Sequence, residues 1–398
     1  MKTNKEMNVK TKVPLFLITA SLFIVTTSVN LQVPLYTTYA IDAHFGKALT
    51  ALVFAAYILG LIPVLIFFGG ISDQLGRKPI LLSSLIFSFI ATFIITIYPT
   101  MYVLLLTRII QGISLGLSVG TCTAYLIGIY PEKSKSIPIY IALASSIGFG
   151  SGALFTTVVL AYVPSPTPIS YWVILSCIIL IFCAVLLFVP AVPGKGGKIM
   201  NLPTFPVGTL PIDLSIALAW TVSGLVISIL PSQLKQYGLE LWVGPALFLV
   251  NGVGALMQPF ARRMQSIKAL QLGFFLLPIG YVIMMLGSGT GLIFFVLIGA
   301  GIAGAACYGF TYLGGLSEVV SCSENEEARA VSGYFLFAYL GFGLPSILIG
   351  YIADNVGVFN SILYFSIVIT LCSIILFFLV SKRKKHLISH VSKSNSHM

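Results

Sequence analysis

The segment Gly69-Gly70-Ile71-Ser72-Asp73-Gln74-Leu75-Gly76-Arg77-Lys78-Pro79 separates two long apolar stretches, residues 48–69 and 79–98. Each stretch has about 20 residues, the length that an α-helix needs to cross the hydrocarbon of a bilayer. The segment places one carboxylate and two cations between glycines that permit a tight turn. Because such charges stay at the membrane surface, the segment predicts a short polar loop between two membrane-spanning helices.

The same alternation of apolar stretch and polar loop continues through all 398 residues, of which 58% are hydrophobic and only 8% charged. Soluble domains carry about 25% charged residues, so the composition predicts an all-α membrane protein with about twelve spans. We expect an N-terminal six-helix bundle at 1–190, a Gly-, Pro- and Lys-rich linker at 191–210, and a C-terminal six-helix bundle at 211–398. The expected helices lie near 13–39, 48–69, 79–98, 101–129, 138–163, 171–190, 211–231, 241–261, 269–287, 290–315, 331–351 and 359–380.

The net charge of +11 comes from loop residues, and their placement argues against a nucleic-acid partner. With the N-terminus placed in the cytoplasm, all 22 Lys and Arg residues except Lys47, Lys235 and Arg108 fall on the cytoplasmic side or in cytoplasmic loops. This asymmetry is the positive-inside rule, and it predicts a multi-pass plasma-membrane protein with both termini in the cytoplasm. The lipid bilayer is the expected partner, and we expect a monomer.

The residues quoted first also resemble a known signature, the loop between helices 2 and 3 of the major facilitator superfamily, Gly-x-Leu-Ala/Ser-Asp-Arg-x-Gly-Arg-Lys/Arg. Gln74 departs from it, because the family usually has Arg there. Residues 326–333 resemble the acidic-Arg loop of the same family and contain Arg329. The resemblance implies a conformational latch formed by Gly69, Asp73, Gly76, Arg77, Lys78 and Arg329. The alternative is a basic turn that serves only to orient the chain in the membrane.

Arg108 lies inside the fourth expected span, in Leu104-Leu105-Leu106-Thr107-Arg108-Ile109-Ile110-Gln111-Gly112. This stretch resembles the family's helix 4 motif, Arg-x-x-Gln-Gly, which is associated with proton-coupled transport. A cation within a membrane span is costly and usually faces a cavity or a partner, so Arg108 is a candidate functional residue. The alternative is an Arg that snorkels to the outer interface.

Polar residues at helical spacing extend this candidate site. A stripe of polar residues follows Arg108 along one face of helix 4, and a second stripe lies on helix 1 at a comparable depth. The family resemblance implies that helices 1, 4, 7 and 10 line a central cavity. Ordinary helix packing remains an alternative for the aromatic members. The predicted substrate and proton cavity consists of Arg108, Gln111, Asn30, Thr26, Ser118, Trp220, Tyr308 and Tyr312.

The sequence shows no clear carboxylate at membrane depth in helices 1, 4, 5, 7 or 10, and a cavity with one Arg and no acid disfavours cationic substrates. Helix 5 contains Gly148, Gly150 and Gly152, reminiscent of the family's antiporter motif, but Ala153 stands where that motif has Pro. No Walker motif and no metal-ligand spacing of His is present, so we expect neither a cofactor nor a metal.

The resulting hypothesis is a secondary active transporter, not an enzyme, which works by alternating access. Its most favoured activity is proton-coupled export of a small amphiphilic or anionic metabolite or drug. An uptake symporter on the same fold and a lipid flippase remain alternatives.

Overall fold

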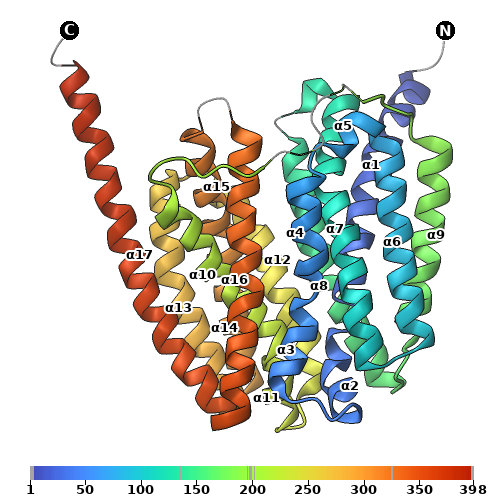
Figure 1. Ribbon diagram of the computed structural model, residues 1–398, viewed down its shortest axis with the longest axis vertical. Helices are drawn as coiled ribbons and strands as arrows, with labels where there is room; N and C mark the ends of the chain where they lie inside the picture. Colours follow the sequence, from blue (N-terminus) through green and yellow to red (C-terminus); the bar gives the residue numbers. More distant parts are fainter. Residues whose placement is uncertain are drawn as a thin grey trace. The chain divides into compact units, whose positions relative to one another are not determined.

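The computed structural model describes residues 4–395 except 135, 195, 197–199, 201, 324 and 325, and it describes side chains from Lys12 to Lys382 with Ala328 also excepted. Lys198 and the Arg and Lys residues at 383–385, which contribute to the predicted cytoplasmic charge, lie outside these described side chains. The described chain is helical, and its long helices lie alongside one another within each part of the molecule (Figure 1).

Twelve helical segments of the described chain are long and apolar enough to cross a membrane, which confirms the predicted all-α membrane fold. Several spans consist of more than one helix. The elements up to the linker are α1 (Asn4–Val29), η1 (Val33–Leu35), α2 (Tyr36–Asp42), α3 (Lys47–Ala55), α4 (Tyr57–Phe67), α5 (Ile71–Leu75), α6 (Arg77–Ile97), α7 (Met101–Ile129), η2 (Pro131–Lys133), α8 (Ile137–Tyr162) and α9 (Ile169–Phe188).

The elements after the linker follow the same pattern of long apolar helices joined by short turns. They are α10 (Leu210–Ser228), α11 (Leu230–Lys235), η3 (Glu240–Trp242), α12 (Val243–Ala261), α13 (Ser266–Thr290), α14 (Ile293–Gly304), the π-helix η4 (Ala305–Thr311), α15 (Tyr312–Ser321), α16 (Glu327–Val356) and α17 (Val358–Asn395).

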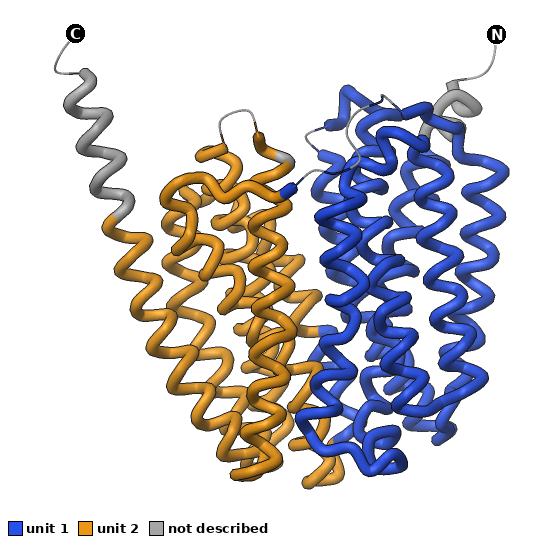
Figure 2. The backbone as a smooth tube through the Cα atoms, in the orientation of Figure 1, with its two compact units in different colours: residues 1–202, 240–248 blue, residues 203–239, 249–398 orange. Residues whose placement is uncertain are grey.

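The chain divides into two compact units (Figure 2). Unit 1 comprises residues 1–202 and 240–248, and unit 2 comprises residues 203–239 and 249–398. One boundary, between Leu202 and Pro203, falls within the segment 191–210 that sequence composition marks as a linker, and the other two fall at 239/240 and 248/249. Each unit is described below by itself.

Close glycine contacts hold the helices of unit 1 together. A Cβ atom on Gly112 of α7 would lie 1.9 Å from the Tyr57 carbonyl oxygen of α4, and one on Gly60 of α4 would lie 2.0 Å from the Ile109 carbonyl oxygen. Glycine at both positions lets the two backbones touch, as small residues do in packed membrane helices. The backbones of α4 and α7 therefore approach each other closely one turn from Arg108.

A corresponding contact occurs in each unit between the first and fifth spans. In unit 1, a Cβ on Gly148 of α8 would lie 2.0 Å from the Thr26 Oγ1 of α1. In unit 2, a Cβ on Gly341 of α16 would lie 2.2 Å from the Ala217 carbonyl oxygen of α10. Gly148 and Gly341 each begin a Gly-Phe-Gly sequence, at 148–150 and 341–343, and each lets the fifth span of its unit pack closely against the first.

Four spans are irregular where the sequence predicts continuous helices, and the expectation of unbroken helices at 13–39, 48–69, 211–231 and 290–315 is wrong. The first span breaks between α1 and η1, where Pro34 has no N–H to continue the helical hydrogen bonds. The second breaks at Ala56, between α3 and α4. The seventh span breaks at Ile229, between α10 and α11. The tenth contains the π-helix η4, a rare geometry that often occurs at functional sites.

Candidate functional site

Arg108 is fully buried in unit 1, where its guanidinium contacts the first and second spans close to their breaks. Its Nη1 donates to the Val29 carbonyl oxygen at 2.7 Å, and its Nη2 and Nε donate to the Phe54 carbonyl oxygen at 3.1 and 3.4 Å. Its Cζ also lies 4.8 Å from the ring centroid of Tyr57 and 5.6 Å from that of Phe54. The cation is thus surrounded by carbonyl oxygens and ring faces.

These partners explain how an Arg is accommodated at membrane depth. Val29 is the last residue of α1, and Phe54 lies in the last turn of α3. The carbonyl groups at a helix C-terminus have no intrahelical donor and carry the negative end of the helix dipole. Arg108 therefore supplies donors and positive charge to two helix ends that the membrane interior could not otherwise satisfy.

Gln111 extends this network one turn along α7. Its Oε1 accepts from Arg108 Nη1 at 3.2 Å and from Gln32 Nε2 at 2.8 Å, while its Nε2 donates to the Ser28 carbonyl oxygen at 3.2 Å. Gln32 lies in the break of the first span and was not among the predicted site residues. In this buried network of Arg108, Gln111 and Gln32, hydrogen-bond donors are paired with acceptors, as a low-dielectric environment requires.

The other polar residues of the predicted cavity in unit 1 donate hydrogen bonds to backbone carbonyl oxygens. Asn30 Nδ2 donates to the Phe149 carbonyl oxygen of α8 at 2.9 Å, so this hydrogen bond leads to α8 and not to Arg108. Thr26 Oγ1 donates to carbonyl groups of its own helix and abuts Gly148. Ser118, also fully buried, donates to the Leu115 carbonyl oxygen. Asn30 and Thr26 therefore contact α8, whereas the hydrogen bond of Ser118 stays within α7.

The predicted aromatic residues of unit 2 come together around Trp220 of α10. Its ring centroid lies 5.1 Å from that of Tyr339, 5.7 Å from Tyr308, 6.1 Å from Phe342 and 6.4 Å from Phe335. The centroid of Tyr312 lies 6.1 Å from that of Phe335. We call these six residues the aromatic cluster. Its members come from α10, η4, α15 and α16, so the cluster is built where the tenth span becomes a π-helix.

The aromatic cluster contains an unused hydrogen-bond donor. The Nε1 of Trp220 is buried and has no hydrogen-bond partner within the described residues, whereas a buried Trp usually finds one. Tyr308, Tyr312 and Phe335 are only partly buried. The cluster therefore offers ring faces with one free donor beside them.

The predicted latch residues hold the start of the linker against unit 1. Arg77 Nη2 lies 3.4 Å from Asp73 Oδ1, and a Cβ on Gly128 of α7 would lie 2.0 Å from Arg77 Nη1. Lys78 Nζ donates to the carbonyl oxygens of Leu186 and Val189, at the end of α9, at 2.8 and 2.7 Å. The ammonium group of Lys78 therefore binds the carbonyl oxygens at the C-terminal end of α9.

Backbone contacts complete this arrangement. The carbonyl oxygen of Asp73 accepts from the Gly196 N–H at 3.0 Å, and the Arg77 N–H donates to the Val192 carbonyl oxygen at 3.4 Å. Gly76, with φ of 91°, turns the chain between α5 and α6 in a conformation that favours glycine. Gly69 is exposed just before α5.

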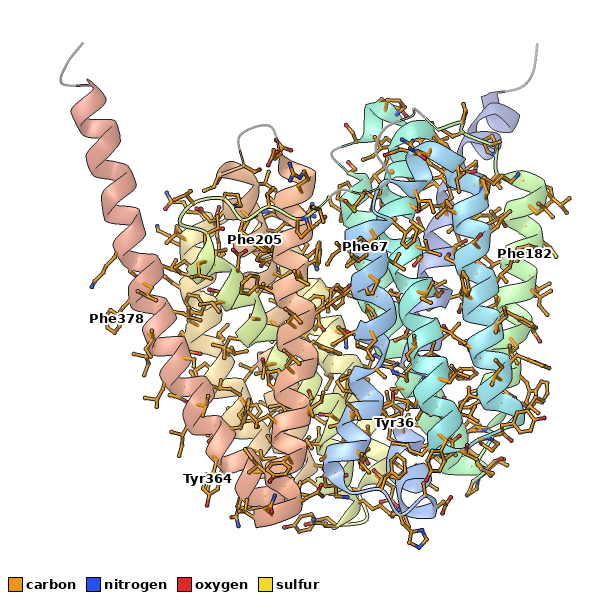
Figure 3. The ribbon with its side chains drawn as sticks, viewed as in Figure 1. Tyr36, Phe67, Phe182, Phe205, Tyr364 and Phe378 are labelled. Carbon is orange, nitrogen blue, oxygen red and sulfur yellow. The ribbon has the colours of Figure 1, made fainter. Side chains whose placement is uncertain are left out.

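Arg329 lies in unit 2, at the start of α16. Its Nη1 pairs with Glu326 Oε1, and its carbonyl oxygen accepts from the Thr204 N–H at 3.1 Å. The next linker residue, Phe205 (labelled in Figure 3), packs edge to face against Phe337, with ring centroids 5.8 Å apart. The predicted latch residues are therefore found in two places. One group contacts Val192 and Gly196 of the linker on unit 1, and Arg329 contacts Thr204 on unit 2.

Asp213 is not among the site residues predicted from the sequence. It is 2% exposed, and it is the only buried carboxylate among the acidic residues that the structure describes. Its Oδ2 accepts from Thr209 Oγ1 at 2.9 Å in the first turn of α10. The pattern Thr209-Leu-Pro-Ile-Asp213 could have signalled a helix start, but not that this start is buried.

The fold defines the class of protein: a multi-pass α-helical membrane protein with twelve candidate spans. A family model described as Major Facilitator Superfamily matches residues 18–321, which is more than half of the chain. No curated protein matches the sequence closely. The chain therefore belongs to the Major Facilitator Superfamily, and it has the fold of a transporter.

Solved structures of transporters share this fold at low sequence identity. A mutant of the nucleoside transporter NupG has a TM-score of 0.70 and 12% identity, covering 93% of this chain and 99% of that chain. A bacterial homologue of the human lysosomal transporter Spinster has a TM-score of 0.73 and 14% identity, and the match covers 92% of this chain and 96% of that chain. A POT family transporter in complex with 5-aminolevulinic acid has a TM-score of 0.74 and 13% identity, and the match covers 94% of this chain and 96% of that chain. The TM-scores establish the shared fold, and identities this low leave the substrate open.

Proposed function

We propose that the protein is a secondary active transporter of the plasma membrane, which exports a small amphiphilic metabolite or drug in exchange for protons by alternating access. The observation that carries the substrate class is the aromatic cluster with the unpartnered Nε1 of Trp220. Ring faces attract a planar apolar group, and a single buried donor selects a substrate that places an acceptor beside it.

The hydrogen bonds of Arg108 support an amphiphilic substrate over an anionic one. Its Nε, Nη1 and Nη2 all donate within unit 1, to Val29, Phe54 and Gln111. These bonds use four of the five guanidinium N–H groups, so an anionic group that takes two parallel bonds has to displace one of the acceptors, such as a helix-end carbonyl. Leaving that carbonyl buried and unpaired costs about 1–3 kcal/mol, which reduces the gain from binding the anion.

Proton coupling requires a group that can change its protonation state away from bulk water. Asp213 is our candidate, because it is the buried carboxylate of the described chain and lies in α10, the helix that also carries Trp220. A structural alternative exists, since an acid in the first turn of a helix stabilises that helix through the dipole. Asp213→Asn keeps the shape and removes the titration, so it separates the two roles.

Direction and coupling are tested in everted and right-side-out vesicles with an imposed proton gradient. For an exporter, everted vesicles should accumulate an aromatic amphiphilic substrate when the lumen is acidic, and Asp213→Asn should remove the response to the gradient while downhill exchange persists. Accumulation in right-side-out vesicles driven by inward proton flow would instead establish uptake.

The substrate class is tested by two substitutions of one residue. Trp220→Phe keeps a ring face and removes the donor, so it should weaken binding of a substrate with an acceptor by about tenfold, the value of one lost hydrogen bond. Trp220→Ala removes both and should weaken it further. Tyr351→Phe, on an exposed residue of α16, is the control and should have no effect. Wild-type affinity in Trp220→Ala would show that the substrate binds elsewhere.

A further inference from the structure

An apolar groove of about 620 Å³ runs between α13 and α17 of unit 2. Both helices are candidate membrane spans, and large side chains on the groove remain exposed, including Phe275 at 63%. Phe378 is 59% exposed and is labelled in Figure 3. Thr370 and Ser373 are the polar members of a lining that is otherwise apolar. The main apolar residues are Phe274, Phe275 and Pro278 of α13 with Ile374, Phe377 and Phe378 of α17.

One end of this groove carries two exposed lysines. Lys268 is in the first turn of α13, and Lys382 follows Phe378 by one turn of α17. The bond from Gln271 Nε2 to Ser381 Oγ, at 2.7 Å, shows that these two helix ends are adjacent. At 1.5 Å per residue, each lysine lies about 6–9 Å beyond the apolar lining along the helix axis.

Neither lysine is in an ion pair or hydrogen bond with any other residue that the structure describes. Lys268 shares a helical face with Gln271 and Phe275, and Lys382 shares one with Phe378. The positive charges therefore follow the same faces that form the groove, and they would meet the headgroup region of a bilayer when the groove lies in its hydrocarbon.

Unit 1 provides an internal comparison. A groove of about 160 Å³ lies between its third and sixth spans, α6 and α9, and is lined by apolar residues that include Phe89 and Phe182. There the lysine at the start of α6, Lys78, donates to the end of α9 and is satisfied within the protein. The groove of unit 2 is almost four times larger, and its lysines are left for an external partner.

We infer that this groove is a binding site for one anionic phospholipid, whose acyl chain lies along the apolar lining and whose phosphate contacts Lys268 and Lys382. The apolar lining selects an acyl chain, and the lysine pair selects a negative headgroup. A juxtamembrane Lys near an anionic surface contributes about 1 kcal/mol, which corresponds to about fivefold in affinity for each lysine.

Native mass spectrometry of the full-length, delipidated protein in detergent tests the site. The probes are dioleoyl phosphatidylglycerol, dioleoyl phosphatidylcholine and inorganic phosphate. The protein should bind one phosphatidylglycerol about thirtyfold more tightly than phosphatidylcholine. Lys268→Gln combined with Lys382→Gln should remove that preference, whereas Lys12→Gln combined with Lys133→Gln, on exposed lysines of unit 1, should preserve it.

A second pair of variants tests whether the acyl chain occupies the groove. Val282→Trp fills the lining and should weaken both phospholipids, while Leu286→Trp, one turn along α13 and outside the lining, should weaken neither. Equal binding of the two phospholipids by the wild type, or unchanged binding in Val282→Trp, would overturn the proposal. Competition by inorganic phosphate at the concentration of the lipid would show a simple anion site and would overturn it as well.

Discussion

Replacing Arg108 tests whether its buried guanidinium stabilises the first and second spans where their helices break. Arg108→Ala removes the donors from the carbonyl oxygens of Val29 and Phe54, whereas Gln111 Oε1 keeps its bond from Gln32. Each orphaned acceptor costs about 1–3 kcal/mol. The energy needed to bury the guanidinium in the wild type offsets part of this loss, so we expect a net destabilisation of about 3 kcal/mol.

Arg108→Lys provides an intermediate case. A lysine keeps the charge, but its compact ammonium lacks the planar fork with which the guanidinium reaches two separate helix ends. We therefore expect a loss of about 1–2 kcal/mol, corresponding to one carbonyl left without its donor. Active transport should be abolished in Arg108→Ala and impaired in Arg108→Lys, because the breaks in the first two spans lose their common partner.

The assay measures unfolding in detergent by intrinsic fluorescence and, separately, transport and substrate affinity in proteoliposomes. Arg263→Ala, at an exposed position, is the matched control and should change stability by less than about 0.5 kcal/mol. A wild-type unfolding curve for Arg108→Ala would refute the argument from helix-end carbonyls. If Arg108→Lys instead kept full stability and lost ten- to a hundredfold in affinity, the guanidinium would be binding an anionic substrate.

Three further predictions concern helix packing, the latch and topology. Gly112→Ala should destabilise the protein by about 3 kcal/mol in the same unfolding assay, because its Cβ would meet the backbone of α4, whereas Gly120→Ala, with nothing within 4 Å, should not. Asp73→Asn should impair reconstituted transport with nearly normal membrane insertion, since its partly exposed pair with an arginine contributes at most about 1 kcal/mol to stability; wild-type turnover would contradict a latch. The topology is tested with an impermeant maleimide in a background without native cysteines. Val207→Cys, at a fully exposed linker position, should be labelled only in everted vesicles, and Val163→Cys only in intact cells. The reverse labelling pattern would show that the predicted topology is inverted.

The sequence by itself determined the membrane-spanning architecture. The length of an apolar stretch and the polar residues that end it are local properties of the sequence. An apolar stretch long enough to cross a bilayer has to satisfy its own backbone hydrogen bonds there, so it forms a helix. The loop containing Asp73, Gly76 and Arg77 carried a pattern specific enough to indicate the family, and the position of Arg108 inside an apolar stretch marked it as a candidate functional residue.

Only the tertiary structure decided what those partners are. The carbonyl groups of Val29 and Phe54 lie 79 and 54 residues from Arg108 along the chain, and they can accept its hydrogen bonds because their spans break nearby. Every residue has a carbonyl group, so sequence cannot mark the two that are available. The burial of Asp213 and the grouping of aromatic rings around Trp220 likewise depend on how helices from different spans pack, which the periodicity of any single helix does not contain.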